Sequence, residues 1–139
     1  MSTRGTYTFK DENCEHHVYH HYDNYPSGAA DFIKAALSHA WPLPRFEADE
    51  FAAAFVVGAK GIGRPGGTRL MKTGDWEEIS NWDIEYHYEI TCLDGELHIV
   101  AEEVEGVEHC RWDEEQGLLQ SHRIFEGSYA EFLEFAKIT

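Results

Sequence analysis

The stretch HHVYHHYDNYP, residues 16–26, places four histidines, three tyrosines and one aspartate within eleven positions. Imidazole and carboxylate groups at this density could bind a metal ion or transfer protons. In an extended strand, however, residues four apart lie about 13 Å from each other. His16 with His20, or His17 with His21, therefore cannot bind one metal ion together, and a site would need a partner such as His87.

The candidate metal ligands are accordingly His17 or His21, one of them at a time, together with His87. His98 and His122 are further candidate partners from other strands. No spacing in the chain matches an established zinc pattern such as HExxH. We therefore expect ordinary cross-strand pairing of histidine and tyrosine, with no metal and no cofactor. A metal-binding protein or metal-dependent enzyme that uses the histidine-rich strand is the alternative interpretation.

The segment GIGRPG, residues 61–66, matches the GxGxxG pattern of dinucleotide-binding loops. That pattern requires a helix immediately after the loop and a βαβ unit around it. Pro65 and Gly67 are followed instead by a β-rich region, so a nucleotide site is not expected. The basic side chains Lys60, Arg64 and Arg69 leave a second alternative, which is a small-anion site at this loop.

A nucleophilic enzyme is not predicted. Cys14 lies near the histidines, and a hairpin would bring it close to His16, but the sequence offers no orienting residue or oxyanion loop. The three cysteines, Cys14, Cys92 and Cys110, have no CxxC spacing, which is typical of a reduced cytoplasmic protein. The N-terminus lacks the apolar segment of a signal peptide, and no stretch is long enough to span a membrane.

Charge is the most unusual global feature, because 11 basic and 26 acidic residues give a net charge of −15. Residues 1–70 hold seven basic and eight acidic residues, and residues 71–139 hold four and eighteen. Such a surface repels nucleic acid and anionic membranes and attracts basic surfaces. Solubility alone is the other explanation of the charge.

The acids of the second half fall on predicted strands and their connections, with tryptophans among them, as anchors in interfaces often lie. The predicted partner-binding residues are Asp83, Glu85, Glu89, Glu102, Glu105, Trp82 and Trp112. We expect them to bind a basic protein partner, and we expect no direct contact with nucleic acid or membrane.

Two hairpins and three helices should position these residues. Residues 6–10 and 16–22 predict an N-terminal hairpin, which a turn at Asp23-Asn24 joins to a helix capped by Ser27. Helical spacing extends to Ala40, and a second helix begins near Asp49. The five glycines of residues 58–67 predict a mobile loop.

Residues 82–92 alternate cleanly between apolar and polar side chains. Asp94-Gly95 predicts a type I′ turn, which places Ile90 opposite Ile99 and His87 opposite Glu102. Two further strands are expected over residues 107–112 and 118–125. A last helix begins at Ser128, and Ser128 and Glu131 form a capping box.

These elements predict one α+β domain over residues 1–139. Its sheet is expected to be antiparallel, with an N-terminal hairpin and a C-terminal meander, and two or three helices pack on one face.

Two motifs resemble those of small proteins encoded by phages, prophages and plasmids. Their pattern H-x-D-G-Y-P-x-G-A corresponds here to residues 21–29, HYDNYPSGA, and their D-x-E-Y-x-Y corresponds to residues 83–88, DIEYHY. Asn24 replaces the usual glycine, and both residues suit a turn with positive φ. The resemblance implies a mobile-element origin and no established activity.

Together these features predict a non-catalytic, acidic accessory protein of a mobile element that acts in the host cytoplasm. It would bind a basic surface of a host or defence protein, and inhibition by mimicry of nucleic acid is the concrete version of this hypothesis.

Overall fold

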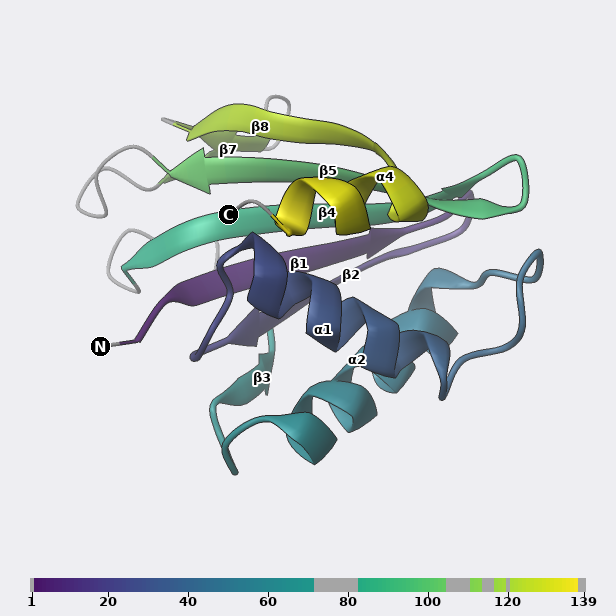
Figure 1. The fold of residues 1–139 in the computed structure, drawn as a ribbon, viewed down its shortest axis with the longest axis horizontal. Helices are drawn as coiled ribbons and strands as arrows, with labels where there is room; N and C mark the ends of the chain where they lie inside the picture. The colour runs from purple at the N-terminus through teal and green to yellow at the C-terminus, as the bar shows by residue number, and fades with distance from the viewer. Residues whose placement is uncertain (1, 72–82, 105–110, 114–116, 120, 138–139) are drawn as a thin grey trace.

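The computed structural model describes residues 2–71, 83–104, 111–113, 117–119 and 121–137 (Figure 1). Six strands form one sheet in the order β3-β2-β1-β4-β5-β8. Their bounds are β1 Arg4–Lys10, β2 Glu15–His20, β3 Thr68–Leu70, β4 Ile84–Leu93, β5 Glu96–Val104 and β8 Ser121–Ser128. A separate two-stranded sheet pairs β6, Arg111–Asp113, with β7, Gly117–Leu119.

The sheet is mixed, so the expectation of a purely antiparallel sheet was wrong in this respect. β1 and β4 are neighbours and run parallel, and every other pair in the sheet is antiparallel. Between β1 and β4 the chain forms β2, two helices and β3, which is long enough for a parallel connection. Local hairpin patterns predict the two hairpins correctly, but they do not determine how one hairpin pairs with the other.

The β4–β5 hairpin confirms the predicted register. Ile90 lies opposite Ile99, and His87 lies opposite Glu102. Asp94 and Gly95 both have positive φ, at 52° and 80°, as a type I′ turn requires.

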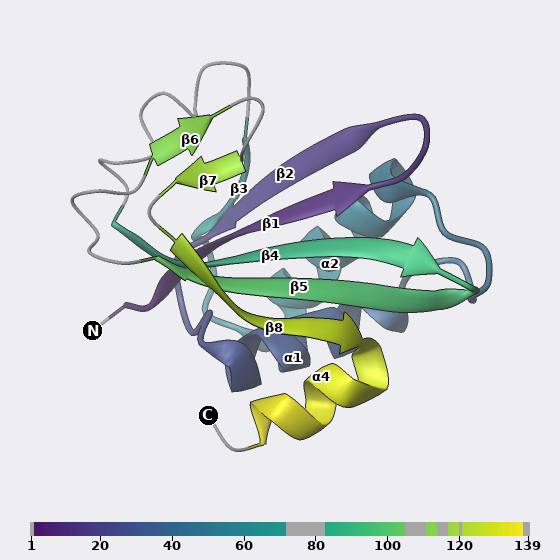
Figure 2. The same ribbon diagram turned by 90° about the horizontal axis from the view of Figure 1, so that it is seen from above.

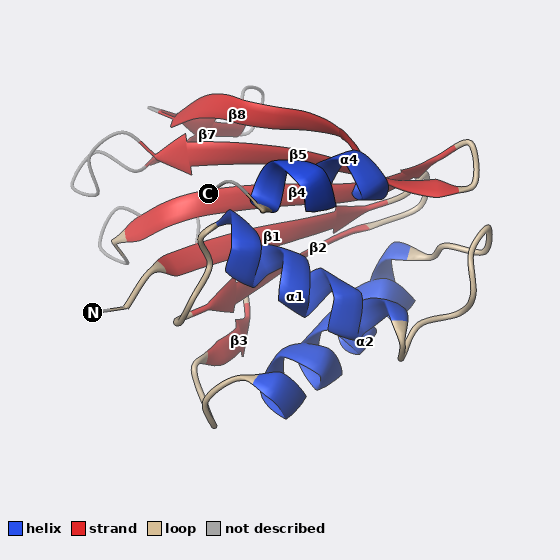
Figure 3. Ribbon diagram, in the orientation of Figure 1, coloured by secondary structure: helices blue, strands red, loops and turns tan. Residues whose placement is uncertain are grey.

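Three helices among the described residues cover one face of the sheet: α1, Pro26–Leu37, α2, Ala48–Ile62, and α4, Tyr129–Ala136 (Figures 1 and 3). Seen from above, the strands of the sheet lie in front of α1 and α2 (Figure 2). Aromatic rings form much of the core between these layers. The Tyr7 ring lies 4.3 Å from Phe55 and 5.2 Å from Tyr88, and Phe132 of α4 meets Tyr88 edge-on. We call the other side of the sheet, which none of the described helices covers, the open face.

Three helix boundaries differ from the prediction. α1 begins at Pro26, two residues earlier than a Ser27 cap implies, since proline is favoured at a first helical position; Ser27 is inside the helix, and Tyr25 is the N-cap. α1 also ends at Leu37, before the predicted Ala40. α2 continues to Ile62, through two of the predicted loop glycines, because Gly58 packs against Ala35 of α1. The capping box of Ser128 and Glu131 is confirmed.

The turn before α1 also differs in detail. Asp23 has the positive φ, 61°, that was expected at Asn24. Asn24 is instead fully buried and hydrogen bonded. Of the strand expected over residues 107–112, residues 107–110 lie outside the described part of the chain.

Candidate functional site

The strand β2 divides the histidine-rich stretch between the two faces of the sheet. His20 is buried on the helix face, where its ring meets Phe32 edge-on at 4.5 Å. His17 is on the open face, half-buried, opposite Thr8 of β1. His21 follows the strand, and its Nδ1 hydrogen bonds to the hydroxyl of Tyr19 at 2.7 Å.

A chain of hydrogen bonds crosses the open face from β2 to β4. The Thr8 hydroxyl bonds to His17 Nδ1 at 2.8 Å and lies 3.5 Å from His87 Nε2. The Thr6 hydroxyl bonds to His87 Nδ1 at 2.7 Å. The Nε2 of His17 lies 3.3 Å from a carboxylate oxygen of Glu15. Cross-strand pairing of this kind is what the sequence predicted for the histidines, with threonine rather than tyrosine as the main partner.

Burial keeps these imidazoles neutral near pH 7. Burial first, and the neighbouring His17 second, together lower the pKa of His87 to about 3. Burial also lowers the pKa of His17, against the opposing effect of Glu15. The order carboxylate, imidazole, hydroxyl from Glu15 to Thr8 is that of a hydrolytic triad. Thr8 is only 3 % exposed, however, and its hydroxyl is shared by two imidazoles. This chain of hydrogen bonds therefore provides partners for the buried polar side chains.

The three candidate metal ligands do not form one site in the described structure. His17 and His87 are connected through Thr8, whereas His21 bonds to Tyr19 beyond the end of β2. Within the described ranges, no group of three histidine, cysteine or acidic side chains is placed to bind a metal ion.

The glycine loop does not form a dinucleotide-binding turn. It follows the C-terminus of α2, which carries the negative end of the helix dipole and does not favour an anion. Lys60 is exposed on α2, the Arg64 guanidinium lies over the Tyr22 ring at 4.9 Å, and Arg69 is on β3 opposite Tyr19. The three cations thus come from a helix, a loop and a strand.

The predicted partner-binding acids lie partly on the open face. Glu85 and Glu89 flank His87 along β4, and Glu102 lies opposite His87 on β5. Burial raises the pKa of Glu102, and the nearby Arg123 opposes that shift. Asp83 precedes β4 and forms a 3.3 Å ion pair with Arg4. Trp82 and Glu105 lie outside the described residues, as does the side chain of Trp112, whose backbone is in β6.

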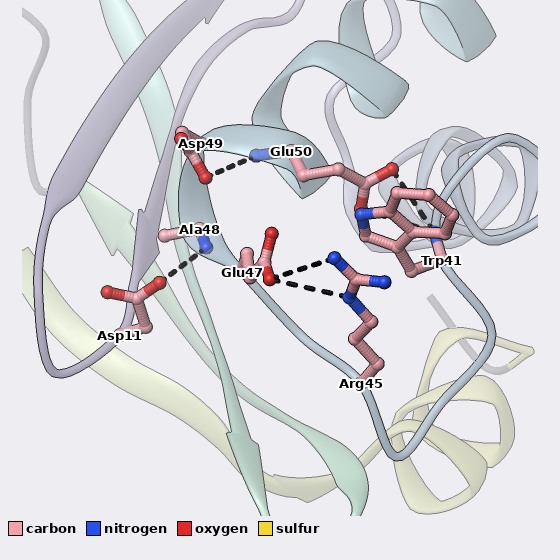
Figure 4. Close-up of polar contacts among 7 residues, drawn as sticks. All are labelled: Asp11, Trp41, Arg45, Glu47, Ala48, Asp49 and Glu50. Carbon is pink, nitrogen blue, oxygen red and sulfur yellow. Dashed lines mark hydrogen bonds and ion pairs between the residues drawn. The ribbon is translucent and has the colours of Figure 1, made fainter.

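A second group of acids was missed by the sequence analysis. The β1–β2 turn meets the first turn of α2 at one end of the sheet (Figure 4). We define the acidic end as the five carboxylates of these two segments: Asp11, Glu12, Glu47, Asp49 and Glu50. A pocket of 250 Å³ opens there, lined by Lys10, Asp11, Glu12, Asn13, Phe46, Glu47 and Cys92.

Asp11 joins the two segments of the acidic end. Its carboxylate accepts hydrogen bonds from the backbone N–H groups of Ala48, Asn13 and Cys14, at 2.7, 2.7 and 2.9 Å. These three donors, that of Ala48 above all, lower the pKa of Asp11 to about 2. The carboxylate is therefore charged at any physiological pH, and it holds the turn against the N-terminus of α2.

An exposed tryptophan is fixed beside these acids. Trp41 is 44 % exposed, and the Arg45 guanidinium lies over its ring at 4.0 Å. The backbone N–H of Trp41 donates to both carboxylate oxygens of Glu50, at 3.2 and 3.1 Å. Arg45 in turn donates to Glu47 at 3.3 and 3.4 Å (Figure 4). The ring is thus held in place without being buried.

The sequence signal for this site was the segment WPLPR, residues 41–45. Its two prolines indicated the end of a helix, but the tryptophan and the arginine on either side of them are also residue types enriched in binding surfaces. The near-neutral charge of residues 1–70 concealed the acids. Five of the eight acidic residues of that half gather at this end, whereas Arg4 begins β1 and Arg69 pairs with Tyr19 near the far end of β2.

No helix among the described residues is long and apolar enough to cross a membrane. Comparison with known proteins found no family model, no curated protein and no solved structure that matches this chain.

Proposed function

We propose that this protein is a non-catalytic, acidic binding protein whose partner is a basic protein surface. The observation that carries this proposal is the acidic end with Trp41 beside it. Five carboxylates from two distant segments gather at this end, and two of them, Glu50 directly and Glu47 through Arg45, hold an exposed tryptophan beside the group. Tryptophan and charge together are what the centre of a binding surface requires.

The open face extends the proposed contact. Glu15 lies on the open face opposite Lys10, next to the acidic end, and Glu89, Glu102 and Glu85 follow at increasing distance along β4 and β5. A partner that covers the acidic end and the near part of the sheet would contact carboxylates of four elements: the β1–β2 turn, the start of α2, β2 and β4. Such a surface favours fast, salt-dependent association with a lysine- and arginine-rich surface.

The concrete version of the proposal is inhibition of a nucleic-acid-binding protein. A basic surface that normally holds phosphates would bind these carboxylates instead, and the net charge of −15 supports that choice over direct contact with nucleic acid. The resemblance to proteins of mobile elements would make the partner a host or defence protein in the host cytoplasm.

The test is affinity capture from host lysate at low salt, release by a salt gradient, and identification of the released protein. Binding of the purified partner is then measured with and without duplex DNA as competitor. We expect a basic partner that moderate salt releases and that DNA displaces. Capture of nothing by folded protein, or of a partner that resists high salt, would contradict the proposal.

A matched pair of variants locates the contact. Glu12→Gln with Glu47→Gln removes two charges from the acidic end. Glu126→Gln with Glu134→Gln removes two exposed charges from β8 and α4. Glu47 and Glu126 each pair with an arginine, and Glu126 also contacts His98 while Glu134 pairs with Lys137, so the control variant loses more internal contacts than the first and is a stringent comparison. Only the first variant should weaken binding.

A further inference from the structure

The outer surface of the α1–α2 pair carries a groove that no described part of the chain fills. It has a volume of 580 Å³ and is lined by Asp31, Lys34 and Ala35 of α1, by Ser38 and His39 just after it, and by Gly58, Gly61 and Ile62 of α2. Gly58 approaches α1 so closely that a Cβ atom there would lie 2.9 Å from the Cβ of Ala35. Gly61 has open space above it, since an added Cβ would meet no atom within 4 Å.

Apolar side chains of α2 stand beside this groove. Ile62 is 56 % exposed, and Val57, one turn before Gly61, is 53 % exposed. Each residue therefore leaves about half of its apolar surface in water, and burial of that surface would be favourable. The α1–α2 surface therefore has both a groove and, next to it, two exposed apolar side chains that could fill such a groove.

The charges around the groove indicate which class of partner fits it. Its rim carries both signs, Asp31 and Lys34 on α1, and Lys60 is exposed next to Gly61 on α2. This surface therefore does not attract a basic protein as the acidic end does, and the net charge of −15 repels nucleic acid. A second copy of the chain carries the same two signs. A two-fold axis would place Asp31 of each copy against Lys34 of the other.

We propose that the α1–α2 groove is a symmetric self-association surface, in which Val57 and Ile62 of one copy pack against the groove of a second copy. The contact is smaller than that of a standard interface, so the dimer should be weak and should dissociate at tens of micromolar, about 10–100 µM. Because both copies carry −15, salt should strengthen the dimer by screening their repulsion. Binding of a basic partner should weaken with salt, so the two associations respond in opposite directions.

The test is sedimentation velocity of the whole chain from about 5 to about 500 µM protein, at about 50 and about 500 mM NaCl. We expect a monomer–dimer equilibrium whose midpoint moves to lower protein concentration at the higher salt. Val57→Glu with Ile62→Glu should leave the chain monomeric throughout, and both side chains are exposed enough for the fold to tolerate the change. Circular dichroism and thermal unfolding check that tolerance.

A matched control variant distinguishes loss of the groove contact from the effect of two added negative charges. Leu70→Glu with Leu93→Glu adds the same two charges at side chains that are 75 % and 58 % exposed on β3 and β4. This variant should dimerise nearly as the wild type does. The two-fold pairing has its own test: Asp31→Lys alone and Lys34→Asp alone should each weaken the dimer, and an equimolar mixture should restore it.

Four results would overturn the inference. They are a wild-type chain that stays monomeric at both salt concentrations, a dimer that persists in the Val57 and Ile62 variant, an equal loss in the control, and an association that weakens with salt. The last result would indicate an association through opposite charges instead of through the groove. The proposed binding of a basic protein is tested separately, because it uses the acidic end and not the residues of the groove.

Discussion

The Tyr7 hydroxyl donates a 2.6 Å hydrogen bond to Oδ1 of Asn24, and both residues are completely buried. The Nδ2 group of Asn24 donates to the backbone carbonyls of Thr3, His20 and Tyr22, at 2.9, 2.8 and 3.0 Å. The Tyr88 hydroxyl donates to the Asn24 carbonyl at 2.6 Å. One side chain therefore joins the start of β1, the end of β2 and the turn into α1.

Replacement of Asn24 by alanine should be strongly destabilising. It leaves the Tyr7 hydroxyl and several buried carbonyls without their partner, and we expect a loss of about 3 kcal/mol or more in the free energy of unfolding. Tyr7→Phe should cost less, about 1–2 kcal/mol, because a single bond is lost. Urea unfolding of both variants and of the double variant measures this. An Asn24→Ala protein as stable as the wild type would refute the structural role of Asn24.

Two glycines should respond oppositely to alanine. A Cβ at Gly28 would lie 1.8 Å from the carbonyl oxygen of Asp23, and neither backbone can move without disrupting the turn. We expect Gly28→Ala to lower stability by several kcal/mol, about 2–4. Gly61 in α2 has free space, so Gly61→Ala should raise stability by up to about 1 kcal/mol. Thermal and urea unfolding at low protein concentration compare the two, and equal effects would contradict this packing.

The buried histidines should make the protein sensitive to acid. The pKa of His87 is about 3 in the folded protein and near 6.5 in the unfolded chain, so the unfolded chain binds the proton first. Stability is therefore complete above about pH 6.5 and falls as the pH drops toward 3, with a slope of up to about 1.4 kcal/mol per pH unit from this group. His20, whose pKa burial lowers to about 4, adds to the slope at the upper end of this range.

His87→Gln should reduce that slope even if it lowers stability at every pH. Urea unfolding at a series of pH values from about 4 to about 7 gives the slope for wild type and variant. His16→Gln, the same substitution at an exposed position of β2, is the matched control against which the slope of His87→Gln is compared. Equal slopes of His87→Gln and wild type would mean that His87 binds its proton as readily in the folded protein as in the unfolded chain.

Short-range patterns in the sequence predicted the hairpins, the β4–β5 register and the last helix. Alternation, a turn dipeptide and a capping box depend on neighbouring residues, so a single sequence reveals them. The parallel pairing of β1 with β4 depends on residues about 80 positions apart. The alternation of apolar and polar side chains in these strands is the same for parallel and for antiparallel pairing, so it does not reveal the direction. The buried role of Asn24 was hidden for a related reason, since its partners come from β1, β2 and β4.

The candidate site was predicted less well than the fold. The charge of residues 1–70 sums to −1, yet folding separates the signs along the strands. Lys10 is the cation near the acidic turn, whereas Arg4 is at the other end of the same strand. Three of the seven predicted partner-binding residues, Glu85, Glu89 and Glu102, do lie on one face. Glu102 is the least available of them, because it is partly buried and lies near Arg123.

Trp41 should contribute to partner binding without contributing to stability. Its ring is 44 % exposed and is held by Arg45, so Trp41→Ala removes contact area that the folded protein does not use internally. We expect affinity for the basic partner to fall about tenfold or more, with a small change in the unfolding temperature. Trp41→Phe keeps an aromatic ring and should lose less. Equal affinity of all three proteins would remove Trp41 from the interface.

The salt dependence of partner affinity tests the central claim most directly. Calorimetric titrations of the purified partner at several salt concentrations, from about 50 to about 300 mM, would be made with wild type and with the Glu12→Gln, Glu47→Gln variant. We predict that the dissociation constant of the wild type rises steeply with salt, and that the variant binds more weakly with a shallower dependence. Affinity that ignores salt, or an identical response of the two proteins, would contradict the account of an acidic binding surface.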